Sequence, residues 1–151
     1  MTVTVTTTRF EVLYLLMKLE ETVNDLAPRV LRYCIGRMGC PSSAEDIAQE
    51  ALTALVQRWR RKGPPDNPDA FVFSIARRRL VRDLIKRKVL APVGFAGDLQ
   101  AFEDNHERVE YRERLGSVCR GLLALPRRDR EILLLTAAGE LDQQTISSLL
   151  G

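Results

Sequence analysis

The sequence has few of the residues that build metal centres, disulfide frameworks and nucleophilic active sites. It contains one histidine, His106, and three cysteines, Cys34, Cys40 and Cys119, which form no CxxC pair. An odd number of cysteines beside a single histidine supports neither a disulfide framework nor a zinc site. No Ser-His or Cys-His arrangement is convincing around that histidine. We therefore expect no catalytic residue, no metal and no cofactor, and a protein that is not an enzyme.

Long hydrophobic runs and a secretion signal are also missing. Residues 1–10 contain no cationic segment followed by an apolar core, and the apolar run 12–17 is far shorter than the roughly 20 residues that span a bilayer. We expect a cytoplasmic protein without a membrane partner. Of the 151 residues, 45% are hydrophobic and 28% are charged, which is enough apolar material for one domain or two small ones.

Positive charge is concentrated in one stretch of the chain. The net charge is only +3, but residues 58–90 hold eleven Lys or Arg against three Asp, which gives +8 there and leaves −5 elsewhere. A basic block near aromatic residues favours nucleic acid as a polyanionic partner. A solvated basic helix is the simplest alternative, and a membrane surface is a weaker one.

Apolar residues recur at helical spacing, which predicts an all-α fold with four or five helices before residue 90 and at most three after it. We expect a first helical segment from about residue 10 to residue 38 that breaks or restarts at Pro28, because proline removes a backbone donor. Residues 1–10 and 90–107 have the composition of loosely structured segments. The chain thus divides into a helical bundle at 10–89, a flexible linker at 90–107 and a second helical domain at 108–151.

Two helices of the first domain have contrasting polar faces. The helix that begins near Ser43 buries an apolar stripe and exposes acidic and amide groups. The next helix, which begins at Asn67-Pro68-Asp69, turns six cations outward: Arg77, Arg78, Arg79, Arg82, Lys86 and Arg87. Exposed pairs with Asp83 contribute only about 0.3–0.5 kcal/mol, too little to offset the repulsion among six cations. An anionic partner would explain the excess.

Aromatic residues lie among these cations in the sequence. Each ring could either pack in the core or lie exposed beside the cations. Trp59 and Phe71 fall on the apolar stripes, which favours a place in the core. Phe73 falls off the stripe, which favours an exposed ring on which an unstacked base could rest.

Three stretches, in this order, resemble the extracytoplasmic-function class of bacterial sigma factors, which direct RNA polymerase to promoters. Residues 43–50, Ser-Ala-Glu-Asp-Ile-Ala-Gln-Glu, look like the region 2 helix that docks on the clamp helices of the polymerase β′ subunit. Residues 71–88 are similar to the aromatic and basic helix that opens the minus-ten element. Residues 125–151 resemble the start of region 4, a helix-turn-helix.

The resemblance implies two contact surfaces for transcription initiation. Core RNA polymerase would bind through Asp46, Gln49 and Glu50. Promoter DNA would bind through Phe73, Arg77, Arg78, Arg82, Lys86 and Arg87. The resemblance also implies an anti-sigma factor as a further possible partner. The alternatives are a stand-alone nucleic-acid-binding regulator, or an inactive sigma remnant that titrates polymerase without initiating.

The chain departs from the family pattern in three places. Phe71-Val72-Phe73 stands where the family usually has Trp-Leu-Tyr, and Arg78 replaces a base-reading Asn with a cation. The chain ends at Gly151, at the turn of the helix-turn-helix, so we expect the helix that reads the minus-thirty-five element to be missing.

The last helix of the chain is short. We expect Asp142 to cap it. Because an eight-residue helix is marginal in isolation, its apolar residues should fray, or bury in the first domain or in a second chain: Ile146, Leu149 and Leu150.

Overall fold

The computed structural model describes residues 3–38, 41–90, 117–118, 121–122 and 124–151. Its regular elements in that part of the chain are all helices: α1 (Val3–Met38), α2 (Pro41–Lys62), α3 (Pro68–Leu90), α5 (Arg127–Ala137) and α6 (Gln143–Leu150). The all-α prediction is confirmed. None of the helices in the described part of the chain combines the length and the hydropathy that spanning a bilayer requires.

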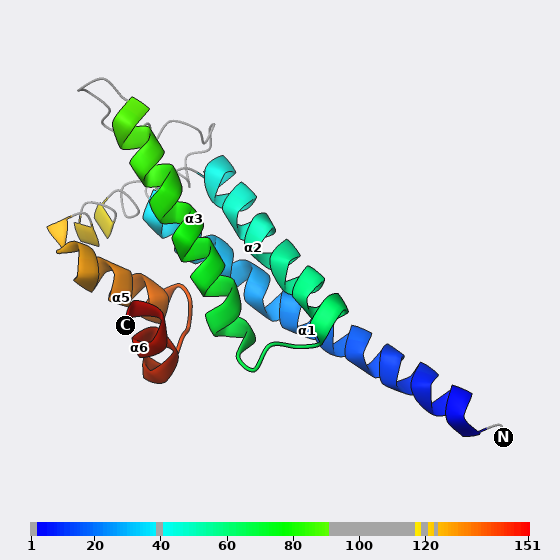
Figure 1. Cartoon of the computed structure of the whole chain (residues 1–151). Coiled ribbons are helices and arrows are strands. Elements are labelled where there is room, and N and C mark those ends of the chain that lie inside the picture. The colour runs from blue at the N-terminus through cyan, green and yellow to red at the C-terminus, as the bar shows by residue number, and fades with distance from the viewer. Residues whose placement is uncertain (1–2, 39–40, 91–116, 119–120, 123) are drawn as a thin grey trace, which may run out of the picture.

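The helices form a three-helix bundle with a short hairpin on one side. α1, α2 and α3 pack along one another, and the hairpin of α5 and α6 lies against α1 and α3 (Figure 1). The linker was predicted at residues 90–107. All of it after Leu90 lies outside the described residues, and so does the start of the second predicted domain at residue 108. The division into two domains therefore stays a prediction, whereas the described helices share one core.

α1 is one helix of 36 residues, so the expected break at Pro28 is wrong, and the described residues before 91 form three helices rather than four or five. It also begins at Val3, where a loose segment was expected. Pro28 and Asn24 both face solvent, so water can satisfy the Asn24 carbonyl that loses its helical donor. Burial of Leu26 and Val30 against the bundle helps offset the cost of an internal proline, about 3 kcal/mol.

The core joins the bundle to the hairpin. The bundle contributes Leu26, Val30, Tyr33, Cys34, Ala44, Ile47, Ala48, Ala51, Leu55, Val72, Phe73, Ala76 and Leu80, and the hairpin contributes Leu134, Leu135, Leu141 and Ile146. Leu149 and Leu150 also pack on this core. Of the outcomes expected for the last helix, burial in the first domain is confirmed.

Two glycines allow the hairpin to approach closely. A Cβ on Gly36 of α1 would lie 2.6 Å from Leu134 Cδ2, and a Cβ on Gly139 would lie 2.9 Å from Phe73 Cε1 and 2.7 Å from the Leu135 carbonyl oxygen. Such distances are shorter than carbon and oxygen atoms tolerate. A methyl group at Gly36 would only displace the end of the Leu134 side chain, whereas a larger side chain there, or any side chain at Gly139, would push the hairpin away.

Gly36→Leu should therefore loosen the hairpin without weakening α1, because leucine favours the helical conformation over glycine by about 1 kcal/mol. We expect faster hydrogen exchange at the Leu134 and Leu135 amides and unchanged exchange in the α1–α2 contact. Gly36→Ala is the matched control, since only the end of the Leu134 side chain must shift. Equal protection of α5 in the Gly36→Leu variant and the parent chain would contradict this packing.

Candidate nucleic-acid interface

α3 presents part of its cationic row to solvent. Val72, Ala76 and Leu80 are buried, and this stripe fixes which side of the helix faces outward. Arg78, Arg82 and Lys86 are exposed on the remaining surface. The start of the helix is set by Asn67, whose Oδ1 accepts from the Ala70 amide at 2.9 Å. Three of the six predicted DNA-binding residues are thus available for phosphate contact.

The other predicted DNA-binding cations differ in their surroundings. Arg77 Nη1 donates to the Leu149 carbonyl oxygen of α6 at 2.9 Å, and Arg77 Nε lies 3.6 Å from Glu131 Oε1 of α5. The hairpin therefore holds a side chain that the sequence assigned to DNA. Arg87 belongs to α3, but its side chain lies outside the described residues.

Phe73 is fully buried, so the prediction that its ring is exposed is wrong. The ring meets Tyr33 edge to face at a centroid distance of 5.4 Å, and it lies against Gly139. Its position is off the stripe of Val72, Ala76 and Leu80, but Tyr33 of α1 and Gly139 of the hairpin cover the ring on that side. Trp59 and Phe71 pack against the core, as expected.

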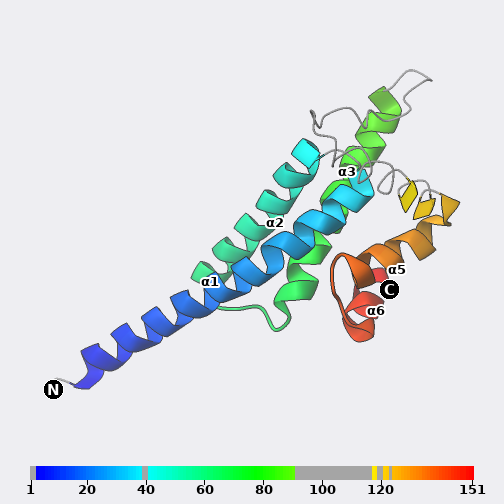
Figure 2. The ribbon, with the colours of Figure 1, turned by 180° about the vertical axis from the view of Figure 1, so that it is seen from behind.

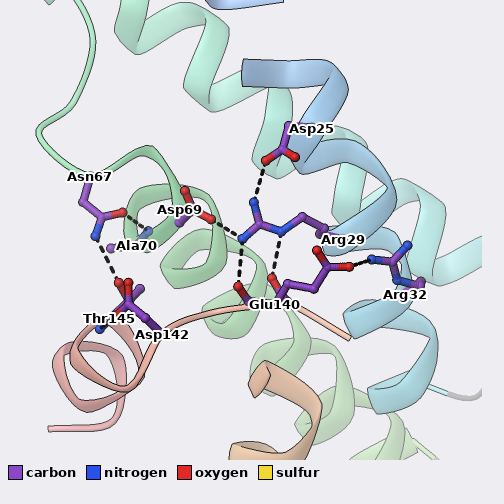
Figure 3. A network of polar contacts seen from close by, with 10 residues as sticks. Asp25, Arg29, Arg32, Asn67, Asp69, Ala70, Glu140, Asp142 and Thr145 are labelled. Atoms are coloured by element: carbon purple, nitrogen blue, oxygen red, sulfur yellow. Dashed lines mark hydrogen bonds and ion pairs between the residues drawn. The ribbon is translucent and has the colours of Figure 1, made fainter. Parts of the chain in front are cut away.

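Arg29 ties three parts of the chain together. Its Nη1 donates to Asp25 Oδ2 at 2.6 Å, and Nη2 donates to Asp69 in the first turn of α3. Its Nε donates to the Gly139 carbonyl oxygen at 2.9 Å, with the Glu140 carbonyl oxygen 3.5 Å from Nη2 (Figure 3). One guanidinium from α1 thus holds both α3 and the turn of the hairpin.

The hairpin turn itself needs this support. Glu140 has φ +54°, in the left-handed region that non-glycine residues rarely adopt. Arg32 Nη2 pairs with Glu140 Oε1 at 2.5 Å, next to the Arg29 contact (Figure 3). Asp142 Oδ1 then accepts from the Thr145 amide at 2.7 Å, which confirms the predicted cap and lowers the pKa of the Asp142 carboxyl. The turn is therefore held by side chains of α1 and by its own cap.

A second polar cluster is buried between α1 and α5. Glu131 accepts from the Tyr33 hydroxyl, and its Oε2 lies 3.0 Å from Arg37 Nη2. The side chains of Arg37 and Glu131 are only 4% and 7% exposed. Burial, together with the Glu131 charge, raises the pKa of Tyr33, so the hydroxyl stays protonated and donates. A carboxylate buried in this way is secured by both a neutral and a cationic partner.

Cations gather around a depression where the hairpin meets the bundle. It is lined by Arg37, Arg77, Val81, Arg127, Arg128, Glu131 and Leu150. Four guanidinium groups against one carboxylate leave a positive surface that suits phosphate groups. Arg127 and Arg128 are exposed and extend the basic surface of α3 onto the hairpin.

The acidic side of α2 is also open to solvent. Asp46, Gln49 and Glu50 are exposed, while Ile47 and Ala48 between them face the core. Glu50 Oε2 lies 3.1 Å from Arg79 Nε of α3. Exposed pairs of this kind contribute little to stability, so Glu50 can exchange this partner for another.

Sequence reasoning missed the residues that hold the hairpin. Arg29 and Glu131 form their contacts across more than 90 positions of the chain, and no local pattern indicates such pairing. One signal was present: Glu131 stands three and four residues before Leu134 and Leu135, which places it on their apolar face. An acid at a core position calls for a buried cationic partner.

Comparison with known families bears on the bundle. Residues 22–89 match the family model described as Sigma-70 region 2. This segment runs from α1 to the end of α3 and contains both the exposed acidic side of α2 and the cations of α3. The bundle is therefore similar to region 2 of sigma-70 factors, and α5 and α6 lie outside the match. No curated protein and no solved structure matches the chain.

Removal of the Glu131 carboxylate should destabilise the protein strongly, because it leaves Arg37 buried without its anionic partner. We expect Glu131→Ala to lower the free energy of unfolding by about 3–5 kcal/mol in urea denaturation. Glu131→Gln should cost less, since its amide oxygen can still accept from Tyr33. Asp129→Ala, on the exposed side of α5, is the control. Equal effects of Glu131→Ala and Asp129→Ala would contradict the buried cluster.

Proposed function

We propose that this protein is a sigma factor of the extracytoplasmic-function class that directs bacterial RNA polymerase to promoters. The observation that carries the proposal is the match of residues 22–89 to sigma-70 region 2, since the acidic and the basic helix both fall inside it. The function is one of binding, and catalysis belongs to the polymerase.

The polymerase-binding surface of the proposal is the exposed side of α2. Asp46, Gln49 and Glu50 lie there, in the stretch 43–50 that resembles the helix docking on the β′ clamp helices. Their exposure supports this role, because a partner reaches them without any rearrangement. Glu50 would give up its contact with Arg79 on binding.

The proposed DNA-binding surface lies on α3, and the hairpin covers part of it. Arg78, Arg82 and Lys86 can contact phosphates as they stand, and this contact is independent of sequence. Arg77 and Phe73 cannot engage DNA in the same arrangement, because α6 holds Arg77 and the hairpin covers Phe73. We infer that stacking of an open strand on Phe73 requires the hairpin to leave α3.

The hairpin is assigned in this proposal to the start of region 4. The stretch 125–135, Leu-Pro-Arg-Arg-Asp-Arg-Glu-Ile-Leu-Leu-Leu, carries the resemblance, and the capped helix α6 follows it. A closed form in which this hairpin occupies the DNA side of region 2 would keep the free protein from opening DNA. Polymerase or DNA would have to overcome the contacts of Arg29, Tyr33 and Arg37 of α1 with the hairpin.

A second candidate function is titration of polymerase without initiation. It is favoured by one observation: the acidic side of α2 is open, whereas Phe73 and Arg77 are held by the hairpin. Promoter-specific transcription in a reconstituted assay separates the two candidates. Transcripts that depend on this protein support the sigma factor, and polymerase binding without such transcripts supports titration.

Charge reversal on α2 should abolish polymerase binding. We expect Asp46→Lys and Glu50→Lys each to remove the protein from a pull-down with core RNA polymerase, because a cation replaces an acid at the contact. Asp66→Lys, an exposed acid in the α2–α3 connection, is the matched control and should bind normally. Binding that is indifferent to Glu50→Lys and Asp46→Lys would sink the proposed surface.

Release of the hairpin should strengthen binding to single-stranded DNA. Leu149→Asp places a charge where α6 packs on the bundle. If the change weakens docking by about 1.4 kcal/mol, the open form becomes about tenfold more frequent and the apparent affinity rises by that factor. Leu133→Asp, on the exposed side of α5, should leave the affinity unchanged in fluorescence anisotropy. Unchanged or weaker binding by Leu149→Asp would contradict the covered surface.

A further inference from the structure

The first part of α1 extends past the end of α2 and the α2–α3 connection, away from the bundle (Figures 1 and 2). Its side chains are unusually apolar for an exposed helix. The exposed fractions are 68% for Phe10, 51% for Val12, 50% for Leu13, 60% for Tyr14, 43% for Leu15, 49% for Leu16 and 68% for Met17. A contiguous apolar surface of this kind marks an interaction site.

The three most exposed of these residues, Phe10, Tyr14 and Met17, share one face with Leu13. Phe10, Leu13, Tyr14 and Met17 follow the spacing i, i+3, i+4 and i+7, so they form a stripe along one side of the helix. Leu19 is buried and lies on the opposite side, which is turned toward the bundle. The stripe therefore faces outward, where no part of the described bundle obstructs an incoming helix.

Charged residues flank the stripe in a self-complementary order. Arg9 and Glu20 are eleven residues apart, close to three helical turns, and lie on one flank. Glu11 and Lys18 are seven apart, about two turns, and lie on the other flank. Each flank thus carries one cation and one anion at opposite ends of the stripe.

We propose that this stripe pairs antiparallel with the same stripe of a second copy of this chain. A twofold axis between residues 14 and 15 brings Arg9 of one copy level with Glu20 of the other, and Glu11 level with Lys18. Lys18 now pairs with Glu21 at 3.1 Å, but both side chains are at least half exposed, so exchange of partners costs little. The pair would bury eight of the most exposed apolar side chains, four from each copy.

The antiparallel direction follows from the rest of α1. Beyond the stripe the same outward face continues with Glu21, Asp25 and Arg32, which are exposed. A parallel pair would place each of these charges against its own copy. In the antiparallel pair, Glu21 and Asp25 lie level with residues 8 and 4 of the other copy, which are both threonines, and Arg32 lies beyond the start of that copy's α1. The two bundles lie at opposite ends of the pair. A lipid surface fits less well, because the flanks carry two acids and two bases rather than the cation excess that favours anionic lipids.

Sedimentation equilibrium of the full chain tests the proposal. We expect a dimer at micromolar concentration, and a monomer for Leu13→Glu/Met17→Glu with unchanged helicity and unfolding temperature, since both residues lie outside the bundle. Ile85→Glu, an equally exposed apolar residue on α3, should remain dimeric. A monomeric parent chain at all concentrations, including one that binds vesicles or polymerase through this stripe, would overturn the proposal.

A charge exchange checks the direction of pairing. Arg9→Glu should weaken the dimer about tenfold by creating two repulsive pairs, and Arg9→Glu/Glu20→Arg should restore it. The two positions are about 16 Å apart along one helix, so restoration cannot come from within a chain. In a mixed sample, Phe10→Cys and Met17→Cys chains should cross-link to each other. Preferred links of each variant to itself would indicate a parallel pair and overturn the antiparallel one.

Discussion

The arrangement of this protein depends on Arg29, a mostly buried cation that bonds to α1, α3 and the hairpin turn at once. Asp25 and Asp69 accept hydrogen bonds from its two Nη atoms and neutralise its charge. The Gly139 carbonyl oxygen accepts a hydrogen bond from its Nε. A buried guanidinium is costly unless all its neighbours are in place. The carbonyl of Gly139 is therefore drawn to the start of α3, and this fixes where α5 and α6 lie. The Glu131 cluster secures the other end of the hairpin on α1.

This constraint links stability to function. The polar contacts that hold the hairpin also hold Arg77 and cover Phe73, two side chains that the proposal assigns to promoter DNA. The acidic side of α2 stays open. In the proposed function, the protein can therefore meet polymerase first and expose the rest of its DNA surface only when the hairpin is displaced. In this account, the energy of polymerase or DNA binding must exceed the energy of docking.

Local sequence patterns predicted much of the fold, but they could not predict contacts between residues that are far apart in the sequence. Helical spacing identified α2 and α3 and the stripes that they bury, and the capping residue of α6 was recognised from Asp142. The predicted break at Pro28 was wrong, because the free-energy cost of a proline inside a helix depends on whether water hydrates the carbonyl that loses its donor, here that of Asn24. The predicted exposure of Phe73 was wrong for another reason. The sequence assigned one face of α3 to solvent, but the hairpin packs on that face. The exposure of Arg78, Arg82 and Lys86 could be anticipated from the crowding of charge, whereas the engagement of Arg77 by Leu149 could not.

Hydrogen exchange at the α5 and α6 amides shows directly whether the hairpin leaves α3 when DNA binds, if the free protein is compared with its complex with core polymerase and a single strand of promoter DNA. We expect strong protection at Leu134, Leu135 and Ile146 in the free protein and loss of that protection in the complex. Protection that is equally strong in the complex would contradict it, because the DNA would then be bound while the hairpin still covers Phe73.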